Sequence, residues 1–550
     1  MRQGLSRLPI LSCSLARSLA CSLSCSLLLG AVGLALPGGP ASAQSLAPRD
    51  SVKEYAPPEY LRQPPTVPPQ FSKQAPRPIT LDEAIATALR NNLDIAIQRE
   101  TVRQRDFLQS LALISFEPTL QLAVSRAKSK TPPTTSLDGR PGQVFPSTLD
   151  SWSLRLSEQL PTATRLTLDF ANGRTDSTLG SAVAPLFFRS TLSFSVSQPI
   201  LQGFSLNNHV QWAPVLRARF DSETAREAAR LKAIATIKTT EDLYWNLVLS
   251  WKAYEVKRGA FALAEKQLTL TRRQIAAGLL AESESIRSES TLARNQVDML
   301  TYEAAIEDAA DRLRQQLNLP PAEWEQPLVP LDAPSFVPQA VAFSAAWERA
   351  LASRPELKTL QIDRQRDSLA LEVARNALLP SLSLSSSIAA LGGDAQYVGA
   401  LDQVAARSGW QWTVGLDFSW QPLGLAARAG VRSAQAGLRL DALQRELALT
   451  QIRLELRAAL RSLSIAERKV YAAARSRDLA ERSLEVEQRR FLNNISDNFK
   501  VAQVQGELEV ARQAELQALI DHEKARSDLL RATGELLEAR NLTFEVHPGG

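Results

Sequence analysis

The chain has 550 residues, of which 44% are hydrophobic, and it carries a formal net charge of +5 at pH 7. Three of the basic residues, Arg2, Arg7 and Arg17, lie near the N-terminus, and the others are interleaved with acids. This distribution excludes a concentrated nucleic-acid-binding surface. The length would allow three or four ordinary domains, but long helices and repeats make that count a weak guide.

Residues 1–43 have the pattern of an export signal. Arginines without acids precede an apolar run, which ends in Gly, Pro and the small-residue site Ala41-Ser42-Ala43. A signal peptide is favoured over a membrane-spanning helix because Ser, Gly and Cys interrupt the run and a cleavage site follows it. Cleavage before Gln44 would remove all three cysteines of the chain, Cys13, Cys21 and Cys25, so we expect no disulfide or thiol chemistry in the mature protein.

Residues 44–78 are rich in proline and poor in aliphatic side chains. This composition predicts an extended arm that cannot form a core. Residues 79–319 form a first repeat, which begins with a helix capped by Thr80 and broken near Asn91-Asn92.

The periodicity of the first repeat changes twice after this helix. Apolar residues alternate with polar ones within residues 117–198, which predicts four strands. Residues 205–319 return to a helical pattern with a break at Gly278. The helix before that break would be about 110 Å long at 1.5 Å per residue, which is longer than a compact domain needs.

Residues 320–339 form a proline-marked connector, after which the pattern starts again. The strand exit Gln198-Pro199-Ile200, for example, returns as Gln421-Pro422-Leu423. The second repeat covers residues 340–541, with a helix, strands over 380–421 and long helices over 426–540, and leaves 542–550 as a tail. The two long helices of this repeat are predicted to meet near Asn493-Asn494.

The first of these long helices carries two apolar seams. One seam consists of Leu440, Leu443, Leu447 and Leu454, and the other of Leu449, Ile452, Leu456, Ala459, Leu463, Ala466 and Val470. A helix with two seams has two neighbours, so such helices can pack side by side into a closed wall around a channel.

The last predicted strand has one apolar and one polar face. Its apolar residues are Trp410, Trp412, Val414, Leu416, Phe418 and Trp420. Such a strand suits a membrane β-barrel with lipid outside and water inside, although an ordinary sandwich strand has the same alternation. Four to six strands cannot close a barrel and an open edge is not tolerated in lipid, so several chains would have to contribute to one barrel.

Over about residues 79–541 the chain resembles the TolC-type outer-membrane efflux proteins. The matching features are the two repeats, the strand entry at Leu379 to Leu384, the two Gln-Pro exits and the sequence Ala277-Gly278-Leu279. The resemblance implies a mainly α fold with a membrane β-barrel, completed by trimerisation, in the outer membrane of a Gram-negative bacterium. A homotrimer would have a twelve-stranded barrel, with four strands per subunit, above a tunnel of twelve antiparallel helices in the periplasm. It would dock to an inner-membrane pump through a periplasmic adaptor.

The sequence departs from that pattern by an additional hairpin at about residues 151–172. This hairpin either lies outside the barrel as an elaborated loop or widens the barrel. We expect the first arrangement, because the strands marked by proline match between the two repeats.

The resemblance also assigns roles to residues at the two breaks between long helices. Gly278 and Asn494 would form the periplasmic tip, since Gly and Asn tolerate a left-handed turn. Gly278-Leu279 and Asn494-Ile495 would border the grooves where the adaptor docks. The acidic gate of the family is kept at Glu284, whereas Lys500 and Gln503 replace acids in the second repeat. A ring of three lysines favours an open tip that leans towards anions, while an ordinary solvated role for Lys500 remains the alternative.

No catalytic or cofactor motif is found in the sequence. The three histidines, His209, His522 and His547, are too scattered to suggest a metal site, and no phosphate-binding glycine loop or nucleophile elbow is present. Two functions remain. The first, which we favour, is a passive outer-membrane exit duct for small molecules or secreted polypeptides. The second is a periplasmic coiled-coil scaffold with a small β domain and no pore.

Overall fold

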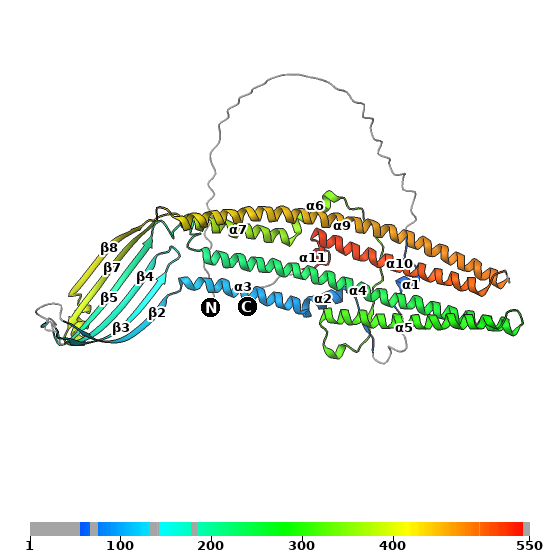
Figure 1. Ribbon diagram of the computed structural model, residues 1–550, viewed down its shortest axis with the longest axis horizontal. Helices are drawn as coiled ribbons and strands as arrows, with labels where there is room; N and C mark the ends of the chain where they lie inside the picture. Colours follow the sequence, from blue (N-terminus) through cyan, green and yellow to red (C-terminus); the bar gives the residue numbers. More distant parts are fainter. Residues whose placement is uncertain are drawn as a thin grey trace, which may run out of the picture. The chain divides into compact units, whose positions relative to one another are not determined.

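The computed structural model describes residues 55–65, 75–132, 140, 142–177, 184–493 and 495–542. The predicted signal peptide, residues 1–43, lies outside this part of the chain, as does nearly all of the predicted tail. The described residues belong to one compact unit, which combines long helices with a six-stranded sheet (Figure 1).

The first repeat begins as its sequence predicts. The side chain of Thr80 accepts a hydrogen bond from the Glu83 N–H at 3.2 Å and caps helix α2 (Leu81–Asn91). Asn92 ends this helix and caps α3 (Leu93–Ala112), because its side-chain oxygen accepts from the Asp94 N–H at 2.9 Å. A 3₁₀ turn, η2 (Leu113–Phe116), then leads into the sheet.

The sheet is antiparallel throughout and has the order β2-β3-β4-β5-β7-β8. Its strands are β2 (Thr119–Thr131), β3 (Phe145–Gln159), β4 (Arg165–Ser177), β5 (Leu186–Pro199), β7 (Ser381–Asp394) and β8 (Gly409–Ser419). A short helix, α8 (Tyr397–Ala405), connects β7 to β8 and packs on β7 and β5. The six strands come from both repeats, so the two copies share one continuous sheet.

The position of the additional hairpin differs from our expectation. We expected it to lie outside the barrel as an elaborated loop, but β3 and β4 are hydrogen-bonded between β2 and β5 along their whole length. The sheet of one chain therefore has six strands, two more than the four per subunit that the family resemblance implies for the barrel. The strands marked by proline occur in both repeats, and their match identified the strands that the repeats have in common. It could not predict which strands an inserted hairpin pairs with.

Two helices run the whole distance between the sheet and the far turns. They are α4 (Ala213–Ala276) and α9 (Leu425–Leu492), with 64 and 68 residues, or about 96 and 102 Å at 1.5 Å per residue. No helix in the described ranges is long and apolar enough to cross a membrane.

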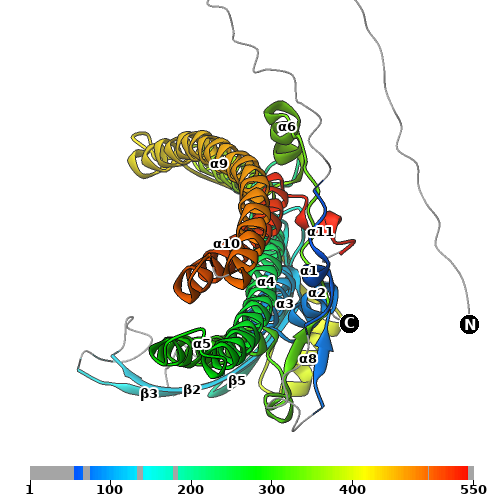
Figure 2. The same ribbon diagram turned by 90° about the vertical axis from the view of Figure 1, so that its right-hand side faces the viewer.

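Shorter helices complete a layer of four at each level. Near the sheet, α3 packs on α4, α4 on α7 (Pro355–Asn376) and α7 on α9. Towards the turns, α9 packs on α10 (Asn498–Thr533), α10 on α4 and α4 on α5 (Ser283–Leu317). Figure 2 shows these last four helices along an arc. Only one predicted seam of α9, from Ile452 to Val470, is buried in the chain, and the other is exposed.

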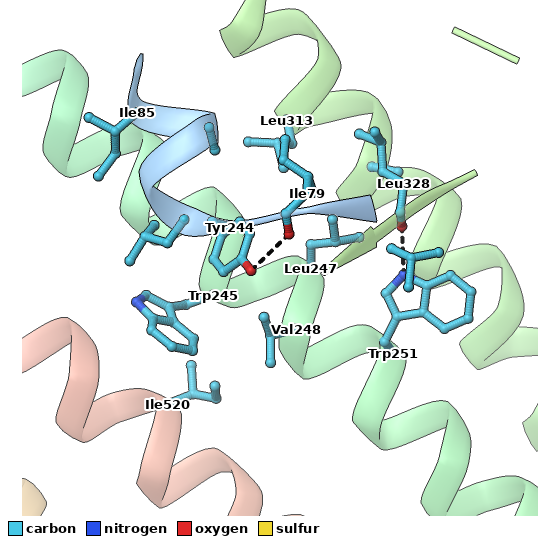
Figure 3. Packing of buried hydrophobic residues seen from close by; sticks show 14 of the residues in the cluster. Ile79, Ile85, Tyr244, Trp245, Leu247, Val248, Trp251, Leu313, Leu328 and Ile520 are labelled. Carbon is cyan, nitrogen blue, oxygen red and sulfur yellow. Dashed lines mark hydrogen bonds between the residues drawn. The ribbon is translucent and has the colours of Figure 1, made fainter. Parts of the chain in front are cut away.

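The largest core cluster lies midway along α4. Strands β1 (Arg77–Ile79) and β6 (Leu328–Pro330) pair in parallel across this helix. The Tyr244 hydroxyl donates to the Ile79 carbonyl at 3.2 Å, and the Trp251 indole donates to the Leu328 carbonyl at 3.0 Å (Figure 3). The side chains of Tyr244 and Trp251 thus bind the backbone of β1 and β6, and both aromatic rings are buried in the core.

The proline-rich segment packs on this core instead of forming only the extended arm that we expected. Its residues Glu59–Arg62 form the helical turn α1, and the side chain of Leu61 is fully buried. The buried Lys252 donates to the Tyr60 carbonyl at 3.0 Å and also to the Gln63 carbonyl, so a cation of α4 fixes the segment through its backbone. Helices α6 (Phe343–Ser353) and α11 (Leu536–Ala539) complete the fold.

Candidate functional site

The turn between α4 and α5 is closed by Gly278. This residue has a φ of +75°, and its N–H donates to the Ile275 carbonyl at 2.9 Å. The Leu279 N–H donates to the Gln274 carbonyl, also at 2.9 Å. These two bonds form a Schellman motif, in which glycine at the left-handed position satisfies the last carbonyls of a helix. The Leu279 side chain that follows is exposed at 62%.

The second turn joins α9 to α10. Asn494, to which the sequence assigns this turn, lies outside the described residues. The Ile495 N–H donates to the Arg490 carbonyl at 2.9 Å, the same spacing as the bond from Leu279 to Gln274. The carboxylate of Asp497 then accepts from the Lys500 N–H at 2.8 Å and caps α10. Ile495, like Leu279, presents an exposed apolar side chain next to its turn.

A buried polar cluster joins the two turns and was missed in the sequence. The side-chain nitrogen of Asn498 donates to the Ser288 hydroxyl at 2.6 Å, and its side-chain oxygen accepts from the Gln267 side-chain amide at 2.8 Å. Asn498 and Ser288 are each 6% exposed. Because the three residues come from α10, α5 and α4, the cluster fixes the start of α10 against the first hairpin. No motif could have indicated it, since common polar residues far apart in the sequence make these bonds.

A groove of about 910 Å³ lies between the first turns of α5 and α10. Glu284 and Gln503, two of the three predicted gate residues, line it together with Arg287, Arg294 and Phe499. The Glu284 carboxylate lies 3.1 Å from the Arg287 guanidinium.

Lys500, the third predicted gate residue, is exposed and is not among the residues that line this groove. The structure therefore brings Glu284 and Gln503 together in one groove and leaves Lys500 outside it.

The sheet forms the second candidate site, because one of its faces is apolar across all six strands. A single cross-strand row of paired residues consists of Leu120, Leu156, Leu168, Phe194, Ile388 and Trp412. Each of these side chains is at least 41% exposed. In an isolated chain this row is an apolar surface without a cover, which is the pattern expected of a lipid-facing sheet.

The neighbouring row points to the opposite face and carries only hydroxyl groups. It consists of Thr119, Ser157, Thr167, Ser195, Ser387 and Thr413. Hydroxyl side chains are suited to water, so the sheet has one apolar and one polar face, an alternation typical of membrane β-barrel strands.

Strand β8 follows the predicted alternation. The apolar residues assigned to it, from Trp410 to Phe418, are between 58% and 66% exposed. Trp420 is exposed in the same way but falls just beyond the strand, which ends at Ser419.

The two described histidines play local roles. His209 lies on the surface, with its ring nitrogen 2.9 Å from the Glu372 carboxylate. The hydrogen bond from the Asn207 amide, together with His209, lowers the pKa of Glu372. His522 is fully buried beside Phe336, and burial lowers its pKa. Within the described ranges, no group of three or more His, Cys, Asp or Glu residues is arranged to hold a metal ion.

Comparison with known proteins relates part of the chain to one sequence family. The sequence profile of the outer membrane efflux protein family matches residues 346–535, which lie in the second repeat. No curated protein sequence matches the chain.

Solved structures with the same fold are outer-membrane channels. The Campylobacter jejuni CmeC outer membrane channel has a TM-score of 0.60 at 15% identity, over 83% of this chain and 86% of that one. The outer membrane protein VceC of Vibrio cholerae has a TM-score of 0.59 at 14% identity, over 82% and 96%. The open state of the Neisseria gonorrhoeae MtrE outer membrane channel has a TM-score of 0.56 at 16% identity, over 83% and 89%.

At such low identities the structures establish the fold, and the profile match relates residues 346–535 to the family. The first repeat has the same architecture as the second, because each contributes strands to the one sheet and a long helical hairpin to the one helical layer. Over residues 346–535 the chain is therefore similar to the outer membrane efflux protein family, and it has the fold of solved outer-membrane channels, in agreement with its TolC-type resemblance.

Proposed function

We propose that three copies of this chain close one channel, with a β-barrel in the outer membrane and a helical tunnel in the periplasm, and that the channel conducts passively. An adaptor would dock at the tip and connect the channel to an inner-membrane pump. The observation that carries this proposal is that the sheet has two unpaired edge strands, β2 and β8, and one apolar face that suits contact with lipid.

Strands β2 and β8 are the outer strands of the sheet, and in the described part of the chain neither has a second neighbour. All residues of β2 are exposed, as are nearly all of β8. Unpaired backbone groups cost several kcal/mol each in hydrocarbon, so both edges need a partner strand. Because the sheet has an even number of alternating strands, β8 of one copy is antiparallel to β2 of the next, and the edges can pair around a ring.

The helices offer a matching pair of surfaces. Near the sheet the outer helices of the layer are α9 and α3. Each has an exposed apolar stripe, Leu440, Leu443, Leu447 and Leu454 on α9 and Leu93, Ile97, Phe107 and Leu111 on α3. If α9 of one copy packs on α3 of the next, both stripes are buried and the four-helix layers join into a ring of twelve.

The tip supports the docking part of the proposal. Leu279 and Ile495 are 62% and 66% exposed next to the two turns, and Phe499 is 64% exposed in the adjacent groove. Such apolar side chains around a polar groove fit a protein partner better than open solvent.

The assembly can be tested through the α9 stripe. Leu443→Glu with Leu447→Glu would place two charges in the interface between copies, and we expect the heat-resistant trimer in purified outer membranes to be lost. The matched control, Gln435→Glu with Ala442→Glu, adds two charges at exposed positions of the same helix outside the stripe and should leave the trimer intact. A trimer that survives the stripe variant would contradict the proposed interface.

A further inference from the structure

We propose that the hairpin β3–β4 is part of the pore wall, so that the assembled barrel has eighteen strands instead of the twelve that the family resemblance implies. This inference rests on the proposed trimeric channel and adds to it the width of the exit. Three copies with six strands each give the number eighteen.

Both strands of the hairpin are paired within the sheet. Strand β3 pairs with β2 over 13 residue pairs, from Thr119↔Ser157 to Thr131↔Phe145, and with β4 over a further 13. Strand β4 pairs with β5 over 12, from Arg165↔Ser197 to Asp176↔Leu186. A hairpin outside the barrel would require β2 to pair with β5 directly, and both sets of hydrogen bonds to the hairpin would be lost.

Both faces of the sheet continue through the hairpin. In the apolar row, Leu156 and Leu168 stand between Leu120 and Phe194. In the hydroxyl row, Ser157 and Thr167 occupy the corresponding places. A loop exposed to water has no need for this alternation, whereas a strand between lipid and an aqueous pore requires it. Arg155 and Asp169 form an ion pair at 3.4 Å on the hydroxyl face. A second ion pair, Arg126 with Asp150 at 3.1 Å, is on the apolar face, but it lies farther along the strands, beyond Val124 and Trp152.

The consequence is a wider exit. With strands about 4.8 Å apart and tilted by about 40°, twelve strands enclose a cylinder about 24 Å across between backbones, and eighteen enclose one about 36 Å across. The exit would then admit folded or bulky cargo that a twelve-stranded barrel excludes, and the selective step would lie at the helical tip.

Spin labelling of the full-length channel tests the inference directly. Because the sequence after residue 43 contains no cysteine, a single introduced cysteine is a unique label site in the processed chain. Leu156→Cys in β3 and Thr167→Cys in β4 probe the two faces of the hairpin, and Trp412→Cys and Thr413→Cys probe the same two rows in β8. In purified outer membranes, we expect labels at 156 and 412 to be more accessible to oxygen than to a water-soluble nickel chelate, and labels at 167 and 413 to show the reverse.

The β8 labels separate this inference from the function on which it rests. Correct alternation at 412 and 413, with water accessibility at both 156 and 167, would overturn the eighteen-stranded barrel and leave the channel standing. Water accessibility at all four positions would overturn both.

A deletion provides a second measurement. Removing residues 145–177 leaves β2 and β5 to pair as one hairpin, so the variant should still assemble as a trimer with a barrel about one third narrower in electron-microscopic averages viewed down its axis. An unchanged diameter would contradict the inference. So would a full-length assembly of two copies, which would close twelve strands with the hairpin included.

Discussion

The Glu284 carboxylate lies 3.1 Å from the Arg287 guanidinium, one turn along α5 in the groove at the tip. The arginine is 67% exposed, so the pair contributes about 0 to 1 kcal/mol and does not lock the groove. The pair matters for the charge of the groove, because Arg287 on the same helix compensates Glu284, the acid that matches the gate of the resembled family. The groove also contains Arg294, Asp497 and the neutral Gln503, so the charges of its lining residues balance.

The first prediction concerns ion selectivity at this tip. With Lys500 exposed and Glu284 compensated by Arg287, the wild-type channel in a planar bilayer should lean towards anions and resist block by multivalent cations. Lys500→Asp should restore the block, because threefold symmetry would bring three carboxylates together. Block of the wild-type channel by micromolar trivalent cations would contradict the basic gate.

The second prediction concerns docking at the turns. Gly278 has a positive φ, and an added Cβ would meet nothing within 4 Å, so a side chain there is opposed by backbone strain alone. Gly278→Asp and Leu279→Asp should therefore leave the trimer assembled but reduce drug resistance or secretion in cells. Gly259→Asp is a suitable control, since this glycine also has open space around its Cβ position but lies within α4. Full resistance in both tip variants would show that the adaptor does not dock here.

The third prediction concerns membrane insertion. Leu416 and Phe418 are 66% and 64% exposed on the apolar face of β8. Replacing both with Asp would place charges on the lipid face, at a cost of about 1 to 4 kcal/mol each depending on depth. The double variant should fail to appear as a trimer in the outer membrane, whereas Thr413→Asp, on the hydroxyl face, should insert. Normal insertion of the double variant would show that β8 does not contact lipid.

The fourth prediction concerns pH. Burial lowers the pKa of His522, while the charges of Glu523 and Glu467 oppose this shift in part. Below about pH 6.5 the unfolded chain therefore binds a proton at this residue that the folded chain resists, and the free energy of unfolding falls as the pH falls. The thermal midpoint should drop between about pH 7.5 and 5.5, and less so in His522→Leu. The surface variant His209→Gln should keep the wild-type difference, and an equal drop in His522→Leu would contradict the assignment.

Local signals in the sequence predicted much of this fold. Thr80 caps its helix, Gly278 takes the left-handed position, and β8 alternates as expected, because each feature depends on residues close together in the chain. Pairings over long distances were not predictable in the same way. The place of the additional hairpin depends on which strand pairs with the edge of β2. The buried polar cluster that joins the two turns depends on a contact between Asn498 and Ser288, which are 210 residues apart.

Electrical recording tests most directly whether this chain forms a conducting channel through the outer membrane. The purified full-length trimer, added to a planar bilayer, should insert in discrete steps of equal ohmic conductance, and heating the trimer to monomers beforehand should abolish them. Absence of conductance steps, together with release of the protein from outer membranes by high-salt buffer without detergent, would contradict the account and favour a periplasmic scaffold.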